Sequence, residues 1–139
     1  MVKQDIILRK INFIVEHLDR LKGKGQVPLK TFLTNTDIQD IVLRNLQVVI
    51  QGCCDLAMHI VSEKEWGLPA TFGGVFDILL EKKVIKPKIH QTMLKMVGFR
   101  NFIVHQYDDI NMETVYINYT ERLGDVRIFL KDISRFARL

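Results

Sequence analysis

Cysteine is scarce in this chain, with only Cys53 and Cys54 among 139 residues. The two are adjacent, and adjacent cysteines rarely bridge each other, so a disulfide framework is excluded. We expect them to be small buried hydrophobic side chains in a reducing compartment. No histidine has a metal-ligand spacing with a cysteine or an acid, so neither a structural metal nor any other cofactor is expected. The scattered histidines are His17, His59, His90 and His105.

Long hydrophobic runs are also missing, because no uninterrupted apolar segment is long enough to span a bilayer. The first twenty residues alternate charges with aliphatic side chains and lack the apolar block of a signal peptide. A cytoplasmic protein without a membrane partner is therefore expected. The composition, 47% hydrophobic and 26% charged, predicts one globular domain over residues 1–139. The net charge of +4 permits an anionic partner such as nucleic acid without requiring one.

Helical periodicity is what the chain does have. Apolar residues recur at steps of three and four, beginning with the stripe Ile7, Ile11, Ile14, Leu18 and Leu21. Asn35 or Thr36 is expected to cap a second long helix, and Pro87 fits the first turn of a later one. Asn111 is expected to cap a last helix whose stripe continues unbroken to Ala137. With no strand alternation, three long helices and two shorter segments predict an all-α antiparallel bundle of four or five helices.

The segment RNFIVHQYDD, residues 100–109, concentrates polar groups directly after an apolar helical segment. Its side chains of interest are Arg100, Asn101, His105 and Tyr107. The helix is expected to end around residues 107–109, because a new helix begins shortly afterwards. An imidazole in a last helical turn is stabilised in its protonated form by the nearby carbonyl groups. That is a sufficient structural reason for a histidine at this place.

Helical geometry raises a difficulty for a catalytic site within one copy of this segment. Asn101 and His105 are four residues apart and share a face, so Asn101 could fix the orientation of the imidazole. Arg100 and His105 are five apart, which places them about 140° apart around the helix axis. Three arrangements remain open: Arg100 swings towards His105, the helix deforms, or two copies of the helix meet and share one pocket.

An imidazole and a guanidinium together are sufficient for RNA cleavage without a metal. The imidazole can take the proton of a ribose 2′-hydroxyl or give one to the leaving oxygen. The guanidinium can hold a phosphate and stabilise the charge that develops on it. From spacing alone, however, a surface arginine, a helix-end histidine and a packing tyrosine are the better explanation.

The wider sequence around this segment resembles the HEPN-domain toxins of the HepT type. In MVGFRNFIVHQYDDIN, an Arg and a polar residue are followed by three residues, a His, one more residue and a Tyr, which is the family signature. Further upstream, DIVLRNLQVVIQGCCDLAMHIV and LPATFGGVFDILLEKKVI resemble the second and third helices of the family. The resemblance covers nearly the whole chain.

The resemblance implies a HEPN bundle that pairs as a homodimer with a shared cleft. It implies a metal-independent ribonuclease with Arg100 and His105 as the catalytic pair and Asn101 in support. The family acts as the toxin half of a toxin–antitoxin pair, and its antitoxin is a minimal nucleotidyltransferase that adds AMP to a tyrosine matching Tyr107. Arg44 could line the cleft, although an ordinary solvated helix charge explains it equally well.

Two alternatives to a ribonuclease remain at this point. The chain could be a non-catalytic helical module that binds a nucleotide or substrate and accompanies a nucleotidyltransferase. It could also be a dimeric helical scaffold with a polar interface. The sequence does not specify an RNA target or a cleavage site.

Overall fold

The computed structural model describes residues 3–23, 27–105 and 110–139, without the side chains of Val104 and His105. This part of the chain contains helices and no strand, which confirms the all-α prediction. The helices are α1 (Gln4–Lys22), α2 (Leu29–Thr34), α3 (Thr36–Glu63), α4 (Phe72–Glu81), α5 (Pro87–His105), α6 (Met112–Glu121) and α7 (Leu123–Phe136).

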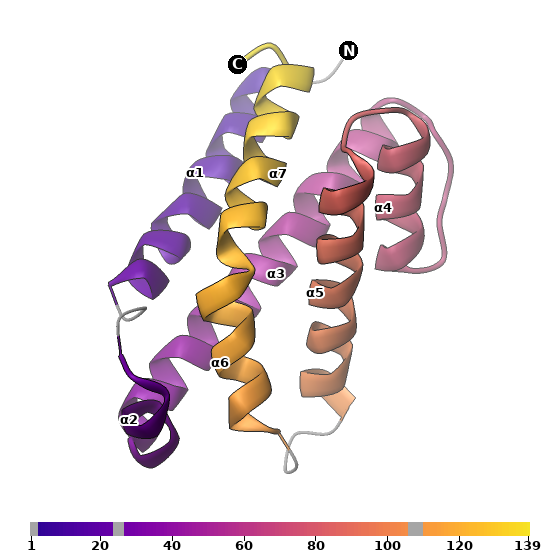
Figure 1. The fold of residues 1–139 in the computed structure, drawn as a ribbon. Coiled ribbons are helices and arrows are strands. Elements are labelled where there is room, and N and C mark those ends of the chain that lie inside the picture. Colours follow the sequence, from indigo (N-terminus) through magenta and orange to yellow (C-terminus); the bar gives the residue numbers. More distant parts are fainter. Residues whose placement is uncertain (1–2, 24–26, 106–109) are drawn as a thin grey trace.

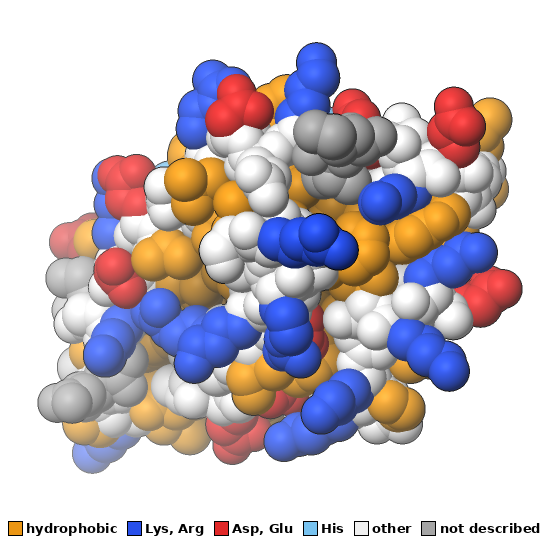
Figure 2. Space-filling view, turned by 90° about the horizontal axis from the view of Figure 1, so that it is seen from above, with side chains coloured by type: hydrophobic (Ala, Val, Ile, Leu, Met, Phe, Trp, Pro, Cys, Tyr) orange, Lys and Arg blue, Asp and Glu red, His pale blue; other side chains and the backbone are white. Residues whose placement is uncertain are grey.

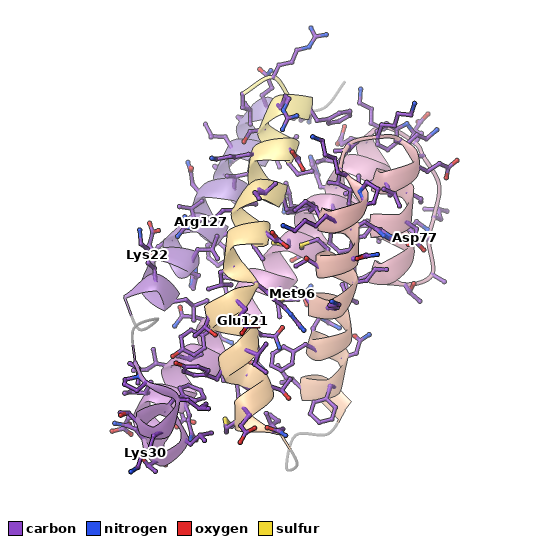
Figure 3. All side chains as sticks on the ribbon, in the orientation of Figure 1. Lys22, Lys30, Asp77, Met96, Glu121 and Arg127 are labelled. Atoms are coloured by element: carbon purple, nitrogen blue, oxygen red, sulfur yellow. The ribbon has the colours of Figure 1, made fainter. Side chains whose placement is uncertain are left out.

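Helix α3 is the centre of the bundle and contacts α1, α2, α4, α5 and α6. Figure 1 shows α1 and α7 side by side to one side of α3, and α4 and α5 to the other. The two chain ends meet at one end of the bundle, where the Gln4 Nε2 group donates to the Ala137 carbonyl oxygen at 2.8 Å. Arg127, labelled on α7 in Figure 3, joins α7 to α1 through Asp19 at 2.9 Å.

The bundle core is built from the predicted apolar stripes. All five residues of the α1 stripe are buried, and burial of such side chains is the main favourable term in folding. Phe76 of α4 and Phe129 of α7 are fully buried and meet edge to face, with ring centroids 5.6 Å apart. Asn35, one of the two residues predicted as a cap, caps α3, since its side chain accepts a hydrogen bond from the Ile38 N–H. Asn111 caps α6 as predicted and accepts from the Glu113 N–H.

The prediction of one unbroken last helix is wrong. Residues after Asn111 form two helices, α6 and α7, separated by Arg122. The backbone of Arg122 stays in the right-handed helical region, at φ −104° and ψ −11°, so the interruption is a kink. Gly124, with its low helix propensity, lies two residues later. The Arg122 side chain donates to the Asn118 side-chain oxygen at 2.8 Å, a contact that bridges the kink.

A close contact between α1 and α3 depends on Gly52. A Cβ atom at this position would lie 2.7 Å from Cγ1 of Ile14, closer than real side chains approach each other. Ile14 is fully buried and has little room to move. The absence of a side chain at Gly52 therefore lets the two helices pack directly against each other.

Helix α3 is long and apolar enough to cross a membrane by length and composition alone. Half of its most apolar window is buried inside the bundle. Because α3 is the central helix, contact with its neighbours accounts for the buried half of this window.

Positive charge is visible at the end of the bundle that carries both termini. Figure 2 looks down on this end and shows Lys and Arg side chains spread across it, with apolar side chains between them. The connection between α4 and α5, at the same end in Figure 1, contributes exposed Lys82, Lys83 and Lys86. Part of the positive charge of the sequence therefore lies at this end of the bundle.

Both cysteines are buried on α3 and neither forms a disulfide, as predicted. Burial raises the pKa of Cys53 well above its usual value and, opposed by nearby Arg100, raises the pKa of Cys54 to about 12. Since the thiolate is the nucleophile, we expect neither thiol to react with iodoacetamide in the folded protein at about pH 8 and both to react after unfolding. Rapid labelling of the native protein would contradict this.

The raised pKa values of Cys53 and Cys54 also predict how the stability of the protein changes with pH. A thiol whose pKa is higher in the folded state contributes stability that is fully present below its unfolded pKa of about 8.5. That contribution is lost as the pH rises above this value, so the free energy of unfolding should fall. Urea denaturation at several pH values above about 8.5 measures this fall. In a Cys53→Ala, Cys54→Ala double variant, the free energy of unfolding should fall less than in wild type as the pH rises.

Candidate functional site

A groove of about 780 Å³ runs between α1 and α3 and is bordered by Arg100 of α5. Its lining combines apolar side chains with charged ones, and the charged ones are mostly cationic. Four basic side chains line it, and Asp55 is its only acidic lining residue within the described part of the chain. The basic residues are Arg9, Lys10, Arg44 and Arg100. Such a groove favours an anionic ligand.

The guanidinium of Arg100 is held in place from several sides. Its Nε donates to Oε1 of Gln51 at 2.8 Å, and its Nη1 donates to Oδ1 of Asn101 at 3.0 Å. Its Cζ atom lies 5.2 Å from the centre of the Phe72 ring, within cation–π range. Gln51 is itself fixed, because its Nε2 donates to Oδ1 of Asp55 at 2.9 Å. The planar group is therefore oriented before any ligand binds.

The Nη2 group of Arg100 has no acceptor among the residues that the structure describes. A guanidinium uses a pair of N–H groups to bind phosphate or carboxylate oxygens. Arg100 is half-buried on the wall of the groove, so solvent screens it less than a fully exposed arginine. Its Nη2 group, which carries two N–H bonds, is available to donate to a phosphate that enters the groove.

The structure brings together three of the predicted site residues. Arg100 and Arg44, which come from α5 and α3, line the same groove. Asn101 is exposed and accepts a hydrogen bond from Arg100, a contact that the sequence analysis did not anticipate. His105 is the last residue of α5, but its side chain lies outside the described residues, as does the whole of Tyr107. The predicted helix end at residues 107–109 also falls outside them.

Gln51 and Phe72, which orient Arg100, were not among the site residues predicted from the sequence. A signal for Gln51 was present on α3, because Arg44, Gln51 and Asp55 recur at steps of seven and four and therefore share one face. This polar face lies opposite the apolar stripe of the same helix. Phe72 offered no such signal, since an aromatic residue at the start of a helix is ordinarily part of the core.

Metal-ligating residues do not gather in the described part of the chain, where no three His, Cys, Asp or Glu side chains form a group. The groove offers a single carboxylate, Asp55, and that group accepts a hydrogen bond from Gln51. The chemistry that these residues offer is binding of an anion and stabilisation of negative charge.

Comparisons with known proteins agree on one family. A family model described as ribonuclease HepT-like matches residues 7–133. An mRNA nuclease HepT of Shewanella oneidensis is 30% identical over 133 residues, which are 94% of this chain and 97% of that protein. A tRNA nuclease HepT of Aphanizomenon flos-aquae is 28% identical over 131 residues, which are 94% of this chain and 89% of that protein.

A similar solved structure is that of a tri-AMPylated Shewanella oneidensis HEPN toxin in complex with an MNT antitoxin. The likeness has a TM-score of 0.84 at 30% identity. It covers 96% of this chain and 99% of the toxin chain. The fold described above is therefore similar to that of a HEPN toxin over nearly its full length.

Proposed function

Because this chain belongs to the ribonuclease HepT-like family, we propose that it is an endoribonuclease toxin that cleaves RNA through Arg100 and His105 without a metal ion. The observation that supports this most directly is the arrangement around Arg100. Gln51, Asn101 and Phe72 hold its guanidinium in the groove, with Nη2 available to a phosphate. The proposal takes residues 1–139 as one HEPN domain acting in the cytoplasm.

The proposed reaction uses the RNA's own 2′-hydroxyl as the nucleophile. A bond forms between the 2′-oxygen and phosphorus, and the bond from phosphorus to the 5′-oxygen breaks, which leaves a 2′,3′-cyclic phosphate and a 5′-hydroxyl. His105 takes the 2′-hydroxyl proton or gives a proton to the leaving oxygen. Arg100 stabilises the negative charge on the phosphoryl oxygens. Imidazole and guanidinium together supply what a metal would otherwise provide.

A homodimer with a shared cleft is part of the proposal. Arg100 and His105 are five residues apart on α5, so their directions differ by about 140° on an ideal helix. Two copies that meet around the C-terminal end of α5 could instead combine an arginine and a histidine from different protomers. The supporting role proposed for Asn101 is to hold Arg100, since it accepts a hydrogen bond from Nη1.

Neutralisation is proposed to occur at Tyr107 through a cognate minimal nucleotidyltransferase. The related Shewanella oneidensis toxin is described as tri-AMPylated and in complex with an MNT antitoxin. An AMP group on Tyr107 would place a negative phosphate close in sequence to Arg100. It would compete with the phosphate of RNA for the same guanidinium.

One cleavage assay tests the proposal. Wild-type protein is expected to cleave RNA in EDTA, and His105→Ala should lower the rate about 10²- to 10⁴-fold, the usual contribution of an acid–base group. Wild type and Tyr107→Phe are also incubated with the nucleotidyltransferase, ATP and Mg²⁺, after which EDTA stops the transfer before RNA is added. Only wild type should be inactivated.

Three results would count against the proposal. Cleavage that disappears in EDTA would contradict metal independence, and full activity of His105→Ala would contradict the assigned site. Equal inactivation of Tyr107→Phe would contradict the modification site. Tight binding of a nucleotide or RNA by a well-folded wild-type protein that cleaves nothing would instead support the non-catalytic module.

A further inference from the structure

Phe13 is an apolar side chain with an unusual position. It lines the cationic groove on α1, yet 51% of its surface remains exposed. Its ring packs beside the His17 imidazole, with centroids 4.6 Å apart, and Nδ1 of His17 lies 2.9 Å from the Phe13 carbonyl oxygen. The ring is thus supported by its own helix, and its exposed surface is available to a flat partner.

The charges around Phe13 indicate what kind of partner this is. Arg9 and Lys10 precede Phe13 by four and three residues, so all three share one face of α1. Arg44 lines the opposite wall, on α3. Arg9 is paired with Asp5 only at 3.7 Å, with both side chains more than three-quarters exposed, so a phosphate can readily replace this contact. An aromatic ring among several cations matches the pattern of proteins that bind single-stranded nucleic acid.

We propose that this groove binds the single-stranded part of the RNA next to the cleaved bond, with one base stacked on Phe13 and phosphates on Arg9, Lys10 and Arg44. This inference rests on the proposed ribonuclease function and names the form of its substrate. A single strand is required because a base within a duplex is already stacked on its neighbours and cannot cover the ring. Arg100 borders the same groove, so a strand held in it leads to the proposed catalytic site.

The groove is less suited to an apolar protein segment. Its four cations face a single carboxylate, Asp55, which already accepts a hydrogen bond from Gln51. An apolar segment could cover the apolar side chains of the groove, but it would offer no acceptor to Lys10, Arg44 or the Nη2 group of Arg100, and covering such charges without acceptors is costly. A polyanion provides a partner for each cation and leaves the exposed ring to a base.

The test measures binding of a short labelled oligoribonucleotide in EDTA, with 2′-O-methyl groups that prevent cleavage, alongside a duplex of the same sequence. Phe13→Ala is expected to weaken single-strand binding about 5- to 150-fold, the effect of losing one stacked base. Phe13→Trp should restore it. Ile128→Ala on α7, whose side chain is 43% exposed and does not line the groove, is the matched control and should bind like wild type.

Salt dependence and kinetics provide independent measurements. Lys10→Ala should reduce the slope of log affinity against log salt concentration by about 0.7, the value for one phosphate contact on a single strand. With a cleavable RNA, Phe13→Ala should raise KM and leave kcat unchanged, because the base is stacked equally before and during the reaction.

Unchanged single-strand affinity of Phe13→Ala would overturn the inference, and so would an equal loss of affinity for the duplex. A change in oligomeric state with no change in affinity would assign Phe13 to a contact between protein copies. The two proposals fail separately. Binding that depends on Phe13 without any cleavage by wild type would overturn the ribonuclease function and keep the groove only as a binding site for single-stranded RNA. Cleavage by wild type, together with single-strand binding that does not depend on Phe13, would overturn this inference and leave the ribonuclease function standing.

Discussion

Replacing Arg100 with alanine is expected to lower the rate constant for RNA cleavage by about 10²- to 10³-fold, the usual cost of losing one positioned group that stabilises transition-state charge. The contacts to Gln51 and Phe72 fix the guanidinium without using all of its N–H groups. Its orientation therefore need not be established during the reaction. Single-turnover cleavage in EDTA measures the loss.

Two further variants separate the effect of the positive charge of Arg100 on the cleavage rate from the effect of its orientation. Arg100→Lys keeps a positive charge but lacks the planar fork, so it cannot bind Gln51 and a phosphate in the same fixed geometry. We expect it to recover only a minor part of the lost rate. Gln51→Ala keeps the arginine but removes the acceptor that orients Nε, and should lower kcat more than it raises KM.

Arg138→Ala is the matched control for these variants, because Arg138 is an exposed arginine that does not line the groove. It should cleave RNA like wild type. The free energy of unfolding of Arg100→Ala should stay within about 1 kcal/mol of wild type, since the groups left behind can reach water. Cleavage by Arg100→Ala at nearly the wild-type rate would remove Arg100 from the proposed site.

Replacing Phe129 with alanine is expected to reduce the free energy of unfolding by about 3–5 kcal/mol. Phe129 is fully buried and packs against Phe76, so truncation leaves a cavity between α7 and α4. Against a typical total of about 5–15 kcal/mol, this is a large fraction. Urea denaturation measures the change. Ile128→Ala, one residue away with a 43% exposed side chain, should change the free energy of unfolding by much less.

The Phe129→Ala substitution in the core is also expected to affect the proposed catalytic site. Phe76 and Phe72 lie one turn apart on α4, and Phe72 contacts the Arg100 guanidinium. A looser α4 should therefore allow Arg100 more freedom, and the remaining folded Phe129→Ala protein should cleave RNA more slowly. A loss of stability below about 1 kcal/mol would indicate that α7 repacks and fills the cavity.

The sequence was informative wherever a structural feature depends on nearby residues. The α1 stripe and the caps at Asn35 and Asn111 follow from helical period and local hydrogen bonding, and all of them are confirmed. The similarity to HepT-type HEPN toxins, drawn from the segment around Arg100, is confirmed by the family model. The kink at Arg122 was missed because the apolar stripe continues through it.

Features that depend on distant parts of the chain were not predictable in this way. Gln51 and Arg100 are 49 residues apart, and only the packing of α3 against α5 brings them together. Phe13 has no sequence signature, since its role depends on the groove that α1 forms with α3. The catalytic roles of Arg100 and His105 and the modification of Tyr107 remain predictions that the experiments above address.

The hydrogen bond between Gln4 and the Ala137 carbonyl has a consequence for how this protein can be built into larger molecules. Both termini lie at the end of the bundle opposite the C-terminal end of α5 (Figure 1). A short linker could close the chain into a circle and permit new ends elsewhere, as in proteins that tolerate circular permutation. An antitoxin fused at either terminus would need a linker that spans the length of the bundle to reach the C-terminal end of α5, and its effective concentration there would depend on how well the linker matches that span.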